Sequence, residues 1–149
     1  MLGAISDVKV FAVSASVLYV KFLATTMIQA RKAFSADTRM PEDRQLICGM
    51  AAVGEKALKI AKDDEQRWKR IIQNDLESMP LAFVVFWSAI SAGVNPELTK
   101  GLLVAYTGAR FCHTVSYARG MPRVRMACWM AGSFCIVTAA VSSVMAALA

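Results

Sequence analysis

One stretch of the sequence carries two arginines, an amide and a carboxylate at the spacing of a helix face. Arg67, Arg70, Asn74 and Glu77 stand at offsets of 0, 3, 7 and 10, which places all four on one side of an α-helix. Guanidinium groups bind carboxylates through paired hydrogen bonds, and a nearby carboxylate can hold an ammonium group. This face is therefore predicted to bind a small ligand that carries anionic groups.

Two further polar groups follow later in the chain. The second group lies on one helix face, at offsets of 0, 3, 4 and 7, and consists of Arg110, His113, Thr114 and Tyr117. The third is the i,i+4 pair of Arg125 and Trp129. His113 is either a neutral imidazole bonded to a neighbouring helix or a general acid or base. Tyr117 and Trp129 are either ligand contacts or aromatic residues of the membrane interface.

The balance of charge among these groups favours a ligand over purely internal pairing. In the alternative interpretation, the groups satisfy one another across helices, as Arg110 would with Glu77 or Asn74, and so fix the packing. The acidic partners on the second segment, Glu77 and its neighbour Asp75, are outnumbered by four arginines: Arg67, Arg70, Arg110 and Arg125. Ionisable residues in apolar spans are costly unless paired or hydrated, so the excess predicts an anionic ligand. Lys21, in the first span, is expected only to snorkel.

Four apolar segments must position these groups. Of the 149 residues, 56% are hydrophobic, and the mean hydropathy is +0.45, which indicates a membrane protein. Met126–Ala149 has no charged residue and is long enough to cross a hydrocarbon core of about 30 Å. We expect an all-α membrane protein with one domain, a bundle of four transmembrane helices at about 8–31, 65–94, 98–119 and 124–148.

The connections between these segments indicate an orientation. Residues 32–64 are expected to form a polar cytosolic loop with a breaker at Pro41, although Glu55–Arg70 should be helical and run into the second span. Asn95 and Pro96 predict the N-cap and first residue of the third helix. The first and third connections are rich in Lys and Arg, so the positive-inside rule places both in the cytosol and both termini opposite.

Other classes of function fit the sequence less well. The formal net charge is +6, but the basic residues lie between the apolar segments and form no single basic and aromatic surface, which argues against binding to nucleic acid. The four cysteines, Cys48, Cys112, Cys128 and Cys135, contain no C-x-x-C pair, and His113 is the only histidine. Neither a disulfide framework nor a metal site is therefore expected.

Two long motifs in successive predicted spans resemble a known family. RIIQNDLESMP and ARFCHTVSYARG, with the KAF and Pro41-Glu-Asp43 elements of the first loop, are similar to the membrane-associated proteins in eicosanoid and glutathione metabolism. The resemblance covers most of the chain and is strongest to the branch of microsomal glutathione transferase 1 and microsomal prostaglandin E synthase. It implies a four-helix protomer of a homotrimer, with glutathione bound between neighbouring subunits near the cytosolic face.

The resemblance also implies roles for individual residues. Arg125 would stand beside the glutathione thiol as the catalytic residue, with Arg123 as the reserve, and a guanidinium there would favour the thiolate. Glutathione carries two carboxylates and an ammonium group, and Glu77 would supply the compensating carboxylate. The residues that would hold glutathione are Arg70, Asn74, Glu77, Arg110, His113, Tyr117 and Trp129.

The function that follows is a glutathione transferase of the endoplasmic reticulum or a related intracellular membrane. It would conjugate or reduce lipophilic electrophiles, including lipid hydroperoxides, that enter from the membrane lipid. Two alternatives are a glutathione-dependent prostaglandin E synthase and a non-catalytic lipid-binding helper. Gln73 and Met126 replace an Arg and a Ser of the prostaglandin E synthases, which favours the transferase over the synthase. The helper would be expected to lack a full glutathione-binding set.

Overall fold

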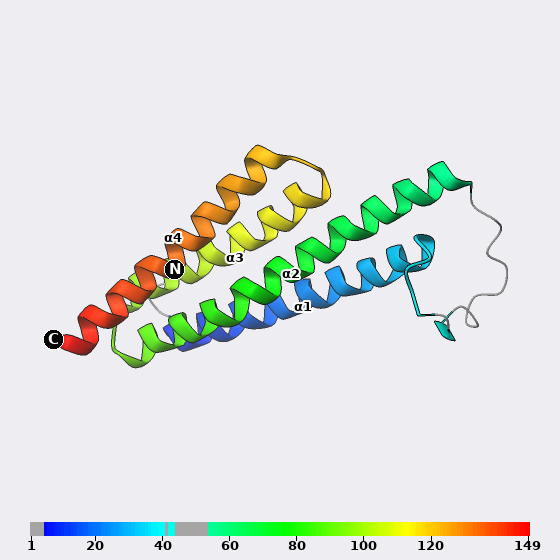
Figure 1. Cartoon of the computed structure of the whole chain (residues 1–149). Helices are drawn as coiled ribbons and strands as arrows, with labels where there is room; N and C mark the ends of the chain where they lie inside the picture. The colour runs from blue at the N-terminus through cyan, green and yellow to red at the C-terminus, as the bar shows by residue number, and fades with distance from the viewer. Residues whose placement is uncertain (1–4, 41, 44–53) are drawn as a thin grey trace.

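Four helices make up most of the structure. The computed structural model describes residues 5–40, 42–43 and 54–149 (Figure 1). The helices are α1 (Asp7–Ser35), α2 (Glu55–Ser91), α3 (Pro96–Ala118) and α4 (Pro122–Leu148). Pro41 and Cys48 lie outside the described residues.

The helix bounds differ from the expected spans mainly around the first connection. α1 continues to Ser35, and α2 begins at Glu55, so both ends of the expected 32–64 loop are helical. The prediction that Glu55–Arg70 is helical and continues into the second span is confirmed. The reason is local, because this segment is rich in Lys, Glu, Ala and Arg, which have high helix propensity. At about 1.5 Å per residue, α2 is roughly 55 Å long, well beyond the thickness of a hydrocarbon core.

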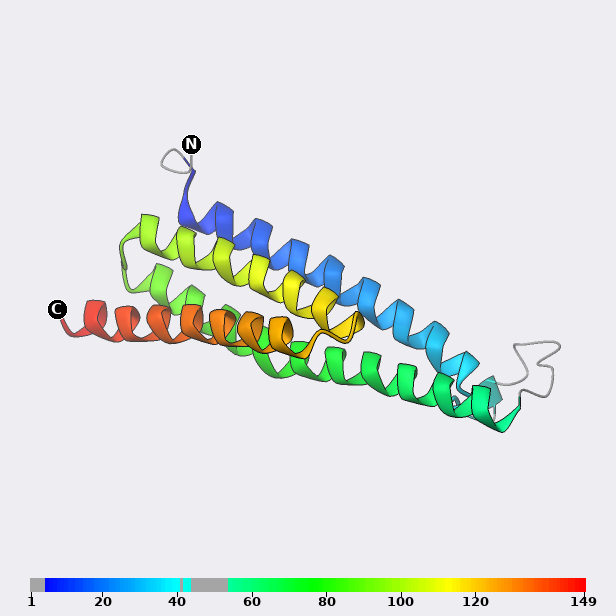
Figure 2. The same cartoon turned by 90° about the horizontal axis from the view of Figure 1, so that it is seen from above.

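Each helix runs antiparallel to the next one along the chain, and α2 and α3 lie in the middle of the bundle. α2 and α3 each contact all the other helices, whereas α1 and α4, both fully described, do not contact each other. The start of α1, the end of α4 and the α2–α3 turn lie at one end, which we call the terminal end, and the α3–α4 turn lies toward the other, the hairpin end (Figures 1 and 2). α1 and α2 project past the α3–α4 turn there (Figure 2). The end of α1, the start of α2 and the basic α3–α4 turn therefore lie toward the same end of the bundle.

Glycines with positive φ form both short turns. α2 is followed by Gly93 at φ 75°, and α3 by Gly120 at φ 68°, a left-handed conformation that ends helices and that suits glycine. The side chain of Asn95 accepts a hydrogen bond from the Glu97 amide at 2.9 Å, and Pro96 opens α3, so the predicted cap is confirmed.

The outside of the bundle is apolar along much of its length. α1 and α4 are long and apolar enough to cross a membrane, by length and composition. α2 and α3 carry more polar residues, and several of these turn inward. Large apolar side chains are exposed on all four helices, among them Val20, Met27, Leu81, Val84, Val104, Phe134 and Met145. An apolar exterior around a partly polar interior is typical of a membrane protein.

Candidate functional site

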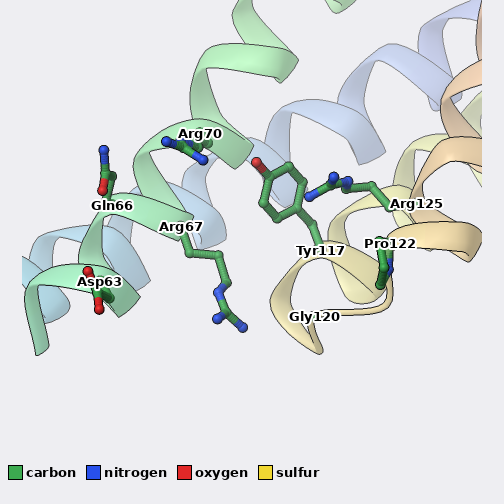
Figure 3. Close-up of a pocket in the computed structure, with 8 residues that line it drawn as sticks. All are labelled: Asp63, Gln66, Arg67, Arg70, Tyr117, Gly120, Pro122 and Arg125. Atoms are coloured by element: carbon green, nitrogen blue, oxygen red, sulfur yellow. The ribbon is translucent and has the colours of Figure 1, made fainter. Parts of the chain in front are cut away.

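A polar pocket of about 370 Å³ opens at the hairpin end, between α2 and the α3–α4 turn. This volume is in the range of small-molecule sites. Figure 3 shows the lining side chains, which come from α2, the end of α3, the turn and the start of α4. They are Asp63, Gln66, Arg67, Arg70, Tyr117, Gly120, Pro122 and Arg125. Three arginines and one acidic residue make this a predominantly cationic pocket.

Tyr117 links the two walls of the pocket. The Arg125 guanidinium lies over the Tyr117 ring, 4.3 Å from its centroid, in a cation–π contact that joins α4 to α3. The Tyr117 hydroxyl points the other way, toward α2 near Arg70 (Figure 3). This stacking restrains the Arg125 side chain while leaving its N–H groups free to donate to a ligand.

Arg67 ties α2 to the end of α3. Its Nη1 donates a hydrogen bond of 3.4 Å to the Ala118 carbonyl, one of the carbonyls left unpaired at a helix C-terminus. A Cβ at position 120 would lie 3.4 Å from the same nitrogen. Gly120 therefore serves both the left-handed turn and the close approach of Arg67.

Arg70 and Arg125 have no ion-pair partner among the residues that the structure describes. Arg70 is exposed and Arg125 is half-buried. Arg123, by contrast, is exposed and does not line the pocket. Two guanidinium groups that face one pocket without carboxylates of their own favour an anion between them.

A second polar cluster lies deeper in the bundle and is internally paired. Asp75 is fully buried, and its carboxylate bonds both to Lys21 Nζ, at 2.5 Å, and to Arg110 Nη2. Arg110 Nη1 also donates to Asn74 Oδ1 at 2.8 Å. The expected internal pairing of Arg110 with Asn74 is therefore present, but the carboxylate that Arg110 meets belongs to Asp75 and not to Glu77. The expectation that Lys21 snorkels is wrong, because Asp75 holds its ammonium group inside the bundle.

His113 lies between the buried cluster and the pocket. Its ring is buried and packs edge-on against Tyr117, with ring centroids 5.8 Å apart. Three buried polar atoms of this turn of α3 lack a hydrogen-bond partner among the described residues: Arg110 Nε, His113 Nδ1 and Thr114 Oγ1. Leaving such atoms unpaired costs about 1–3 kcal/mol each, so they favour polar groups supplied from outside the chain.

Glu77 and Trp129, both predicted site residues, lie outside the pocket and outside the buried cluster of this chain. Glu77 is exposed on α2 and accepts a hydrogen bond of 3.0 Å from Gln73 Nε2. Trp129 is 47% exposed on α4, one helical turn past Arg125. Of the predicted residues, Arg70, Tyr117 and Arg125 meet in the pocket, and Asn74 and Arg110 meet in the buried cluster.

Sequence reasoning missed the pocket residue Asp63 and the central role of Asp75. A signal existed for Asp75, since it stands beside Asn74 in a span and Lys21 stands in another. Two oppositely charged residues within apolar segments are candidates for a pair. Asp63 lies on the part of α2 that precedes the expected span, and its spacing carries no signal of a ligand site.

The fold and the pocket together define an all-helical membrane protein with a cationic pocket at one end of its bundle. The chain belongs to the MAPEG family, because the family model matches residues 10–145. This family is membrane-bound and includes glutathione transferases and prostaglandin E synthases. No curated protein sequence matches the chain closely enough to count as a relative.

Proposed function

We propose that the chain is a membrane-bound glutathione transferase whose pocket at the hairpin end binds glutathione and activates its thiol. The observation that carries the proposal is the set of Arg70 and Arg125 across one pocket, with Tyr117 between them. Glutathione has two carboxylates and one ammonium group. Guanidinium groups suit the carboxylates, and Asp63 on the pocket wall can meet the ammonium group.

In this proposal Arg125 stabilises the reacting thiolate. Thiolate and not thiol is the nucleophile, and a neighbouring guanidinium lowers the thiol pKa of a bound ligand through its positive charge. Arg125 is already held over Tyr117, so little side-chain entropy is lost when the thiol arrives. The thiolate sulfur then attacks a lipophilic electrophile or a lipid hydroperoxide that reaches the site from the bilayer.

The exposed face of α2 supports assembly into the homotrimer of this proposal. Gln73 and Glu77 bond to each other on the surface of the chain, beside the exposed apolar side chain of Leu76. A carboxylate facing hydrocarbon is costly, whereas a second copy could cover it and its uncovered hydrogen-bonding atoms. In a trimer of this kind, Glu77 would contribute to glutathione binding at a subunit boundary. All four helices would cross a membrane, which we propose to be that of the endoplasmic reticulum.

Titration of the purified, detergent-solubilised protein with glutathione tests the proposal. An ultraviolet difference spectrum at the thiolate absorption band should give a saturable signal in the wild type and in Arg123→Ala. The same signal should be lost in Arg125→Ala. Arg123 is the matched control because it lies two residues away on the same helix but outside the pocket. Loss of the signal in both variants, or in neither, would refute the role of Arg125.

Turnover assays then separate the possible functions. A transferase should consume a lipophilic electrophile or a lipid hydroperoxide with glutathione. Isomerisation of a prostaglandin endoperoxide without net use of glutathione would instead identify a prostaglandin E synthase. The absence of any glutathione binding by the folded wild type would overturn the proposal and favour a lipid-binding helper.

A further inference from the structure

Two cysteines face each other across the α3–α4 hairpin, outside the pocket described above. Cys112 lies on α3 and is exposed, whereas Cys128 lies on α4 and is half-buried. The Cys128 thiol lies close enough to the Cys112 thiol for the two groups to interact. Both are free thiols in the structure.

The packing register of the hairpin places these residues opposite each other independently of that contact. A Cβ at Gly132 on α4 would lie 3.9 Å from the Cβ of Ala109 on α3. Cys112 is one helical turn from Ala109 toward the turn of the hairpin, and Cys128 is one helical turn from Gly132 in the same direction. Two facing positions, each moved by one turn along antiparallel helices, remain facing.

The contact between Gly132 and Ala109 brings the backbones of α3 and α4 close together. Gly132 is buried against Ala109 and Tyr106, so the side chains between the helices at this level are small on the α4 side. Small residues at a helix contact allow the close backbone approach that a disulfide needs. We propose that Cys112 and Cys128 form a reversible disulfide across the hairpin, with a lipid hydroperoxide as the oxidant.

The surroundings of the pair indicate an oxidant that arrives through the lipid. Large exposed apolar side chains flank it on both helices: Phe111, Val115, Trp129 and Met130. The pair also lies about 10 Å along the helices from the α3–α4 turn, near enough to the bundle end for the peroxide group of an amphiphile to reach it. Cys112 is the attacking thiol because it is the more exposed of the two.

The chemistry balances in two steps. The Cys112 thiolate attacks the terminal oxygen of the hydroperoxide, the O–O bond breaks, and the lipid alkoxide takes a proton to become an alcohol. Cys112 is then a sulfenic acid. The Cys128 thiol attacks the Cys112 sulfur, the S–O bond breaks, and water leaves with the thiol proton. Two thiols are oxidised, one peroxide is reduced, and two molecules of glutathione can later reduce the disulfide by thiol exchange.

The test exposes the full-length protein, in detergent, to linoleic acid hydroperoxide and then labels it with a maleimide. The reduced wild type should take up four labels, one per cysteine, and the oxidised wild type only two. A non-reducing tryptic map should show Phe111–Arg119 linked to Met126–Ala149. Because the second peptide holds both Cys128 and Cys135, the matched control is Cys135→Ser, which should still form the link.

Two serine variants assign the steps and guard against misfolding. Cys112→Ser and Cys128→Ser should both abolish the link while keeping the wild-type helical circular dichroism. In Cys128→Ser the reaction should stop at the sulfenic acid, which dimedone traps on Cys112. A link that survives in Cys112→Ser, a link found only between separate chains, or a wild type that keeps all four labels would each overturn the proposal. None of these readouts depends on glutathione transfer.

Discussion

Removing the charge of Asp75 should destabilise the bundle far more than removing that of Lys21. Asp75 is fully buried and is the one carboxylate in the described structure that bonds both Lys21 and Arg110. Asp75→Asn leaves two buried cations facing a neutral amide. Breaking a buried ion pair by removing one partner costs about 3–5 kcal/mol, and the loss here should reach the upper part of that range because two cations are stranded.

Lys21→Met gives the contrast. It removes one buried cation, leaves the Asp75–Arg110 pair intact and keeps a side chain of similar length at position 21. Because Asp75 keeps Arg110 as its partner, no buried charge is left uncompensated, and we expect a change within about 1 kcal/mol. Asp63→Asn, at an exposed site, serves as the control for the amide itself and should change stability by less than about 0.5 kcal/mol.

The measurement is unfolding in mixed micelles by titration with sodium dodecyl sulfate, followed by tryptophan fluorescence and circular dichroism. A loss of about 4–5 kcal/mol is a large share of the roughly 5–15 kcal/mol that stabilises a typical domain. Asp75→Asn should therefore unfold at a much lower mole fraction of dodecyl sulfate. Equal midpoints for Asp75→Asn and wild type, or equal losses for Asp75→Asn and Lys21→Met, would refute the reasoning.

Three further predictions concern other contacts of the structure. Tyr106→Phe should cost about 1 kcal/mol in the same unfolding assay, because the 2.9 Å hydrogen bond between the Tyr106 and Ser78 hydroxyls is lost, and the effect should shrink in a Ser78→Ala background. Asn95→Ala should lower stability by about 1 kcal/mol through loss of the α3 cap, while Asn95→Asp should retain most of it. Glutathione affinity should fall as ionic strength rises, since Arg70 is exposed to salt; an affinity that is independent of salt would contradict an electrostatic site.

Much of the fold could be predicted because its signals are local. The helical character of residues 55–70 follows from composition, and the start of α3 follows from Asn95 and Pro96. The exact bounds of α1 and α2 could not be predicted in the same way. Polar residues extend α1 as far as Ser35, and polar residues also form the start of α2 from Glu55. Hydropathy alone does not distinguish a helix outside the bilayer from a loop.

The candidate site was harder to predict because it depends on how the helices rotate about their axes. The spacing of Arg70 and Asn74 predicts that they share one side of α2, but Arg70 lines the pocket and Asn74 bonds Arg110. The partner of Asp75 on α1, Lys21, is 54 residues away in sequence. Spacing within one helix carries no information about that rotation or about which neighbouring helix lies opposite.

The pocket and the buried cluster contain different arginines, and counting charges along the sequence does not separate the two groups. Arg110 is neutralised inside the bundle by Asp75, together with Lys21, so it adds little to the demand for an external anion. Arg70 and Arg125 carry that demand, because neither is ion-paired to a carboxylate of the described structure. The buried cluster fixes α1, α2 and α3 relative to one another. That rigidity holds Tyr117 and the α2 wall in place, so the pocket is preorganised by charges that do not line it.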